Sequence, residues 1–155
     1  MSLIRYIKGD LFNAPKGAVL THSCNCQGSW GGGVAAIFHK KFPVSYETYK
    51  KHCMQYNAEE LLGTCLVIPT SGSEPGGEGY KIACLFTSNG GGGGADPPAK
   101  ILANTDKAMH HLITQLGPSE EIHMPKINAG IFRVPWEDTE EVLKKLNKQI
   151  VVYEV

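Results

Sequence analysis

Apolar residues along this chain fall into short runs with two different spacings. Runs rich in β-branched and aromatic residues predict strands at residues 3–8, 18–23, 61–69, 80–87, 121–125 and 149–153. Longer segments with apolar residues on one side predict helices at residues 34–42, 44–57, 99–116 and 136–146. Because strands and helices mostly alternate, we expect an α/β fold of three layers (α/β/α) with a central mixed, mostly parallel sheet.

The pattern contains no internal repeat and no change of composition that would divide the chain. Residues 1–155 are therefore expected to form a single domain. The glycine-rich segment 71–79 is interpreted as a flexible surface turn without a function.

Charge and cysteine content indicate which classes of partner and which cell compartment to expect. Fifteen basic residues balance fifteen acidic ones, so direct nucleic-acid binding is not expected from net charge. The first residues lack the apolar core of a signal peptide, and no stretch is long enough to span a bilayer, so no membrane partner is expected. Five cysteines, an odd number, fit a reducing compartment, which predicts a cytoplasmic or nuclear location. We interpret Cys53, Cys65 and Cys84 as small buried apolar residues.

Three loops are candidates for a ligand site because each follows a predicted strand: residues 24–33, 88–94 and 126–135. The first and the third are rich in small residues directly before a helix, where backbone N–H groups can bind an anion. Two such loops suggest two walls of one groove with room for a diphosphate. The patterns GxxxxGK[ST] and GxGxxG are both absent, which argues against a triphosphatase loop and a dinucleotide fingerprint.

Four segments resemble the macrodomain family, a family of ADP-ribose-binding α/β/α proteins. They read YIKGDLF at residues 6–12, HSCNCQGSWGGGVA at 22–35, LFTS at 85–88 and MPKINAGIFRVPW at 124–136. The second segment is most similar to the branch that acts on ADP-ribose 1''-phosphate, a by-product of tRNA splicing. The resemblance implies a metal-independent hydrolase without a cofactor, which removes the terminal phosphate of ADP-ribose 1''-phosphate to give ADP-ribose.

The resemblance also implies roles for single residues. Asp10 would accept a hydrogen bond from the adenine amino group, Asn25 would bond the distal ribose, and Phe132 would lie over that ribose. Taken alone, Asp10 could cap a helix, Asn25 could be a turn residue, and Phe132 could belong to the core. The ligand-binding residues predicted in this way are Gly9, Asp10, Leu11, Ser23, Cys24, Trp30, Gly31, Gly32, Gly33, Val34, Ala35, Thr87, Ser88, Ile127, Asn128, Ala129, Gly130, Ile131 and Phe132.

At three positions the sequence lacks the catalytic residues of related hydrolases, which argues against their reaction mechanisms. Hydrolases that remove ADP-ribose from proteins carry an aspartate at the position of Ala35, and the glycohydrolase group carries a lysine and an aspartate where Ser88 and Phe132 stand. These side chains cannot replace the missing groups. We therefore predict His22 and Asn25 as the catalytic residues, His22 as an acid or base and Asn25 through a held water. His22 could also be a structural strand residue. Removal of ADP-ribose from mono-ADP-ribosylated protein, and binding of ADP-ribose without turnover, are the alternatives.

Two further features of the sequence stay open. His22, Cys24 and Cys26 alternate and could ligate zinc from one side of a strand, but no fourth ligand lies nearby and the spacing is unusual, so no metal is expected. The run Gly90–Gly94 is interpreted either as a flap over the ribose end or as slack before Pro97.

Overall fold

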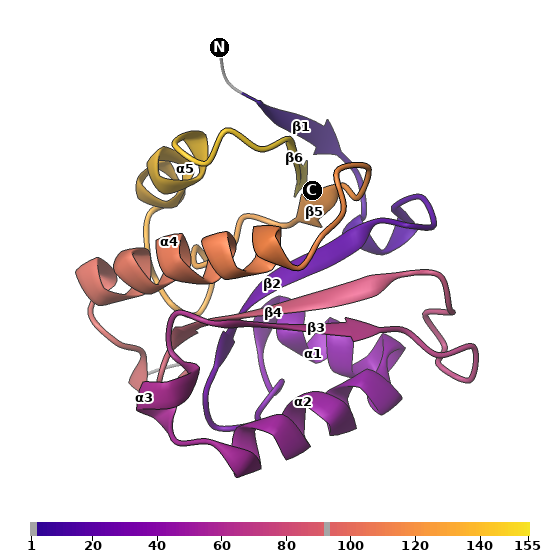
Figure 1. The fold of residues 1–155 in the computed structure, drawn as a ribbon, viewed down its shortest axis with the longest axis horizontal. Helices are drawn as coiled ribbons and strands as arrows, with labels where there is room; N and C mark the ends of the chain where they lie inside the picture. Colours follow the sequence, from indigo (N-terminus) through magenta and orange to yellow (C-terminus); the bar gives the residue numbers. More distant parts are fainter. Residues whose placement is uncertain (1–2, 92–93) are drawn as a thin grey trace.

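The computed structural model describes residues 3–91 and 94–155, and within them the chain forms one six-stranded sheet (Figure 1). Its strands are β1 (Ile4–Lys8), β2 (Val19–Asn25), β3 (Cys65–Pro69), β4 (Lys81–Ser88), β5 (Ile122–Met124) and β6 (Ile150–Glu154). They lie in the order β1-β6-β5-β2-β4-β3, and every neighbouring pair is parallel except β3 and β4. The predicted mixed, mostly parallel sheet is confirmed.

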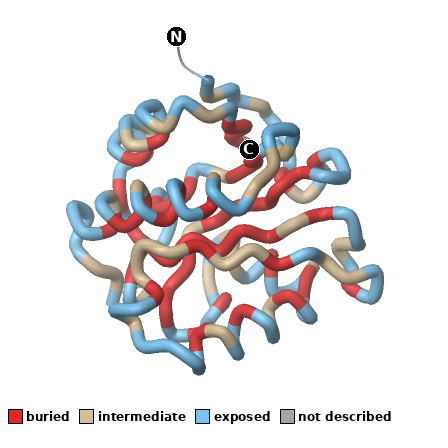
Figure 2. Tube along the Cα trace, in the orientation of Figure 1, coloured by how far each residue is buried: buried red, intermediate tan, exposed pale blue. Residues whose placement is uncertain are grey.

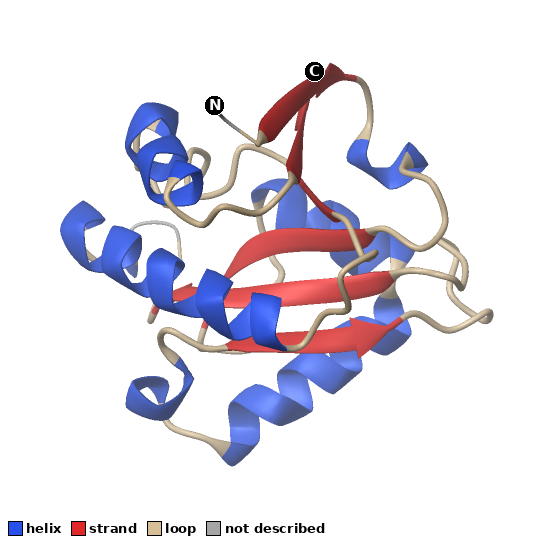
Figure 3. Cartoon of the chain, turned by 45° about the horizontal axis from the view of Figure 1, so that its top comes forward, coloured by secondary structure: helices blue, strands red, loops and turns tan. Residues whose placement is uncertain are grey.

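Helices cover both faces of the sheet, as expected for three layers. One face carries α1 (Gly33–Lys41) and α2 (Pro43–Gln55), and the other carries α4 (Pro98–Thr114) and α5 (Trp136–Lys144) (Figures 1 and 3). Two short helices, η1 (Leu11–Asn13) and α3 (Ala58–Leu61), were not predicted. Within the described residues, no helix has the length and apolar character needed to cross a membrane.

Helix α3 ends at Leu61, the first residue of the strand that the apolar pattern predicted at 61–69. Asn57 and Glu60 form a reciprocal capping box, in which Glu60 N donates to Asn57 Oδ1 (2.9 Å) and Asn57 N donates to Glu60 Oε1 (3.0 Å). Leu61 therefore ends a helical turn and points into the core, and β3 begins only at Cys65.

The apolar side chains form two main cores, one on each face of the sheet. Figure 2 shows buried residues along the central strands and on the helices beside them. Leu20, Ile82 and Phe38 belong to the core under α1 and α2, while Val19 and Met109 belong to the core under α4 and α5. Residues of β2 alternate between the two, because successive side chains of a strand point to opposite faces. All five cysteines are free and buried, which confirms the interpretation of Cys53, Cys65 and Cys84.

The interpretation of residues 71–79 as a flexible turn is wrong, because a buried carboxylate holds this loop. Glu74 is 4% exposed and accepts hydrogen bonds from Ser45 N (2.6 Å), Ser45 Oγ (3.1 Å) and Ser71 N (2.8 Å). Gly76 lies so close to the Phe42 ring that a Cβ atom there would come within 2.4 Å of it. The loop is thus fixed against the start of α2.

Candidate functional site

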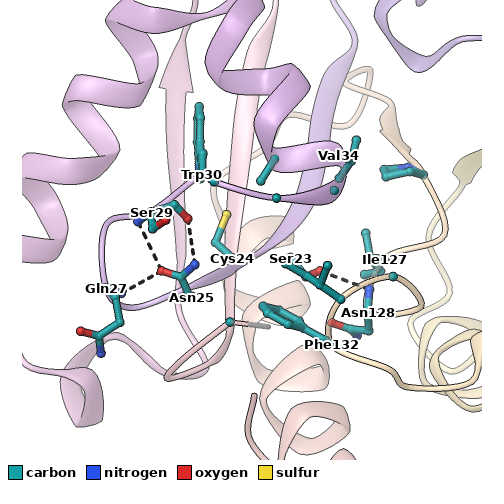
Figure 4. A pocket seen from close by; sticks show the side chains of 18 of the residues that line it. Ser23, Cys24, Asn25, Gln27, Ser29, Trp30, Val34, Ile127, Asn128 and Phe132 are labelled. Atoms are coloured by element: carbon teal, nitrogen blue, oxygen red, sulfur yellow. Dashed lines mark hydrogen bonds between the residues drawn. The ribbon is translucent and has the colours of Figure 1, made fainter. Parts of the chain in front are cut away.

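The loops that follow β2, β4 and β5 line one cavity of about 460 Å³ at the carboxyl ends of these strands (Figure 4). This is where a ligand is expected in an open α/β sheet, and the volume is in the range of small-molecule pockets. Most of the predicted ligand residues line it: Ser23, Cys24, Asn25, Trp30, Gly31, Gly32, Gly33, Val34, Ala35, Ile127, Asn128, Gly130, Ile131 and Phe132.

Other predicted residues lie outside this lining, and some lining residues were not predicted. Gly9, Asp10, Leu11, His22, Thr87, Ser88 and Ala129 are not part of the wall, whereas Gln27, Ser29, Gly91, Pro125 and Lys126 are. The sequence signal for the second group is their position, since each stands inside or beside one of the three candidate loops.

The first glycine loop leads directly into α1. Gly32 is the N-cap residue and carries no side-chain cap, so the first N–H groups of the helix remain available to an anion. Gly33 has φ +58°, a left-handed conformation that favours glycine. A Cβ atom on Gly32 or Gly33 would lie 3.7 or 3.8 Å from the Ile131 side chain, so the two loops face each other across the pocket.

The second loop is held by Asn128, whose side chain points away from the pocket. Its Oδ1 accepts from Thr87 Oγ1 (3.2 Å), and its Nδ2 donates to Thr105 Oγ1 (2.9 Å). Its backbone has φ +65°, and its N–H donates to Ser23 Oγ (3.2 Å). Asn128 and Thr87 therefore shape the loop, which leaves backbone groups rather than the amide to meet a ligand.

Asn25 lies at the end of the pocket nearest β4, held by its neighbours. Nδ2 donates to Ser29 O (2.8 Å), Oδ1 accepts from Gln27 N (2.9 Å), and the buried Tyr49 hydroxyl donates to Asn25 O (2.6 Å). A Cβ atom on Gly91 would lie 3.4 Å from Asn25 Nδ2. Within the described residues Nδ2 donates this one hydrogen bond, so its second N–H remains for a ligand.

Ser88 fixes the loop that carries Gly91. Its hydroxyl donates to Gly90 O (2.6 Å) and accepts from Asp96 N (2.9 Å), and Gly94 N donates to Gly91 O (3.0 Å). Part of the run interpreted as a flap or as slack, Gly92 and Gly93, lies outside the described residues.

Asp10 lies outside the lining of the pocket. Its carboxylate accepts from Phe12 N (2.9 Å) and so caps η1, the alternative that the sequence left open. Glu154 connects this turn to the pocket, because its carbonyl accepts from Gly9 N (2.8 Å) and its carboxylate pairs with the pocket residue Lys126 (2.9 Å). Gly9, the residue before Asp10, is therefore linked through Glu154 to the pocket residue Lys126.

His22 is fully buried below the pocket. Its ring stacks on Phe38 with centroids 4.0 Å apart, and the Trp30 ring lies 5.0 Å away edge-on. Cys24 Sγ is 3.5 Å from His22 Nε2. Burial alone would raise the pKa of Cys24, but the hydrogen bond from Cys84 and the charge and contact of His22 lower it to about 6. Burial raises the pKa of Cys84 well above its usual range.

Comparison with known proteins places the chain among proteins of the same fold and size. The chain is 46% identical to the ADP-ribose 1''-phosphate phosphatase of Meyerozyma guilliermondii and 47% identical to that of Debaryomyces hansenii, with 99% of each chain covered in both cases. Among solved structures, it is similar to the macrodomain of Mycobacterium tuberculosis DarG (TM-score 0.76, 24% identity, 100% of this chain and 99% of that chain).

A second solved structure, Thermosipho africanus DarTG in complex with ADP-ribose, has a TM-score of 0.72 at 18% identity, covering 97% of this chain and 41% of that chain. These structural likenesses concern the fold. The family model described as Macro domain matches residues 21–143, which include all three pocket loops. The chain therefore belongs to the macro domain family.

Proposed function

We propose that this protein binds ADP-ribose 1''-phosphate in the pocket and hydrolyses its terminal phosphate, which yields ADP-ribose and inorganic phosphate. Relatives that are 46–47% identical over nearly their whole length are named ADP-ribose 1''-phosphate phosphatases. The observation that carries the proposal is the pocket itself, in which two loops of small residues face each other and Asn25 stands at one end.

The pocket suggests one orientation of the substrate. The diphosphate lies between Gly31–Gly33 and the loop of Ile131, where backbone N–H groups bind it without a basic side chain. Adenine lies toward Lys126 and Asp10, and the terminal phosphate lies toward Asn25 and Gly91.

The reaction transfers the phosphoryl group to water. The water oxygen bonds to phosphorus as the water gives up a proton, the bond between phosphorus and the ribose C1'' oxygen breaks, and that oxygen takes up a proton. Asn25 Nδ2 can donate to the phosphate or hold the water, and loop N–H groups stabilise the charge that develops. Cys24 lies between His22 and the cavity, so we propose that His22 acts by positioning this end of β2.

Substitution of Asn25 tests the catalytic part of the proposal. Asn25→Asp keeps an oxygen that can accept from Gln27 N, but it removes the free N–H, puts an oxygen against Ser29 O and adds a negative charge. Because removal of one such donor lowers turnover by about 100-fold or more, we expect a loss of at least this size in phosphate release. Calorimetry should show a larger loss of affinity for ADP-ribose 1''-phosphate than for ADP-ribose.

Each other result has a definite meaning. Equal losses of affinity for the two ligands would contradict the placement of the phosphate beside Asn25. If the wild-type protein binds ADP-ribose but releases no phosphate from ADP-ribose 1''-phosphate, it is a reader. If it instead releases ADP-ribose from mono-ADP-ribosylated protein, it is the alternative hydrolase. His22→Phe keeps the ring against Phe38 and removes both nitrogens, so full turnover by this variant would exclude proton transfer by His22.

Asp10 tests the adenine end of the pocket. Asp10→Asn retains an oxygen for Phe12 N and so keeps the cap of η1. We expect this variant to bind ADP-ribose about 10-fold more weakly, because a hydrogen bond to a carboxylate is stronger than one to an amide. The hypoxanthine analogue, which has a carbonyl in place of the amino group, should bind the variant better than it binds wild type. Unchanged preference between the two bases would rule out contact with Asp10.

A further inference from the structure

Three potential metal ligands meet beneath the pocket on neighbouring strands. His22 and Cys24 of β2 point to the same face, and the register of β2 against β4 places Cys84 opposite His22. The ligand atoms of these three residues lie within 4.8 Å of one another, and all three side chains are buried. Cys84 thus takes the place that the alternating pattern gave to Cys26.

The spacing of the ligand atoms agrees with a three-coordinate metal ion. Cys24 Sγ lies 3.5 Å from His22 Nε2 and 3.7 Å from His22 Nδ1. With metal–sulfur and metal–nitrogen bonds of about 2.3 and 2.0 Å, a planar three-coordinate ion would separate sulfur from nitrogen by about 3.7 Å. Because the sulfur is almost equidistant from the two ring nitrogens, the His22 ring, which stacks on Phe38, must turn until one nitrogen faces the ion.

The donor set and its surroundings favour a soft ion. Two thiolates and one imidazole select copper(I) and zinc among biological metals. Within the described residues, no other histidine, cysteine or carboxylate joins these three as a fourth ligand. Structural zinc is almost always four-coordinate, so three ligands favour copper(I). Phe38 and Trp30 pack against His22, and the three ligand side chains are buried, with Cys24 bordering the pocket.

Trp30 supplies an independent observation. Its Nε1 is the one buried side-chain nitrogen or oxygen, among the residues that the structure describes, without a hydrogen-bond partner. The indole ring lies 5.0 Å from the His22 ring, and the Cys24 sulfur points toward it (Figure 4). An N–H group can only donate, and a metal-bound thiolate is an acceptor that would satisfy it.

We propose that His22, Cys24 and Cys84 bind one copper(I) ion in a trigonal site beneath the nucleotide pocket. The ion would join β2 to β4. Cys24 and its neighbours Ser23 and Asn25 line the pocket, so metal binding would also stiffen the pocket wall.

Competition for copper tests the proposal on the full chain. Reduced protein is titrated anaerobically with copper(I) in the presence of a chromogenic copper(I) chelator, and separately with zinc. Wild type should withdraw one equivalent of copper(I), and its unfolding temperature should rise by several degrees. Cys84→Ser and Cys24→Ser should bind at least 10-fold more weakly. Cys53→Ser and Cys65→Ser, which change buried cysteines outside the cluster, should bind as wild type does.

The proposal is overturned if wild type withdraws no copper(I), if Cys84→Ser binds it as well as Cys53→Ser does, or if zinc is retained in preference. Should the serine variants fail to fold, Cys84→Ala and His22→Phe carry the same test, because both remove a ligand atom and keep an apolar side chain in the core. The readout is metal binding, so it is independent of the proposed phosphatase activity.

Discussion

Replacement of Asn128 by alanine should unfold the protein more easily and damage the pocket. The variant loses the hydrogen bonds to Thr87 and Thr105, whose hydroxyls are buried, and an unsatisfied buried group costs about 1–3 kcal/mol. It also places alanine at φ +65°, which costs about 1–2 kcal/mol. Together these changes should lower the free energy of unfolding by about 2–5 kcal/mol.

Two companion variants separate the cost of the lost hydrogen bonds from the cost of the left-handed backbone conformation. Asn128→Gly loses the same hydrogen bonds but adopts the left-handed conformation freely, so it should be less destabilised than Asn128→Ala by about 1 kcal/mol. Asn128→Asp keeps the shape of the side chain but puts an oxygen against Thr105 Oγ1, whose own proton is donated to Ile101 O (2.7 Å). It should therefore be at least as unstable as Asn128→Ala.

Urea unfolding measures the free energies, and calorimetry with ADP-ribose measures the effect on the loop at a temperature where each variant is folded. An alanine variant within about 1 kcal/mol of wild type, with unchanged affinity, would refute the view that this side chain holds the second loop.

Two other predictions concern buried contacts that set the loops. Glu74→Gln turns one acceptor oxygen into a donor that faces Ser45 N or Ser71 N, and urea unfolding should show a loss of about 2–3 kcal/mol. Glu78→Gln, an exposed change in the same loop, is its control, and equal stability of the two variants would contradict the role of Glu74. Tyr49→Phe removes the hydroxyl that donates to Asn25 O and should cost about 1–2 kcal/mol while weakening ADP-ribose binding, as measured by calorimetry. Tyr46→Phe, whose hydroxyl instead bonds Gly28 O, should leave affinity closer to wild type, and the reverse order would refute the prediction.

The sequence predicts the sheet and the pocket loops well because both depend on local patterns. Runs of β-branched residues mark the strands, and small residues directly before α1 mark the first loop. Contacts between distant residues leave no such pattern. Glu74 is 29 residues from Ser45, and nothing in a stretch rich in glycine and serine indicates that a carboxylate is buried there.

The cluster beneath the pocket shows the same limit. Alternation along β2 correctly puts His22 and Cys24 on one face, but the register against β4 shifts between Cys24 and Asn25. The alternation therefore stops before Cys26, and the third member comes from a neighbouring strand 60 residues further along the chain from Cys24. A residue pattern within one strand cannot predict which residue of another strand will lie opposite it.

The alternation along β2 limits the insertions and deletions that the protein can tolerate. Leu20 and Cys24 belong to the core under α1 and α2, and Val19 belongs to the core under α4 and α5. The strand ends in the pocket residues Ser23, Cys24 and Asn25. Deletion or insertion of one residue between Val19 and Asn25 would exchange the two sets, since side chains alternate with a period of two. Such a change of length should abolish folding and ligand binding together, even at positions where a substitution is harmless.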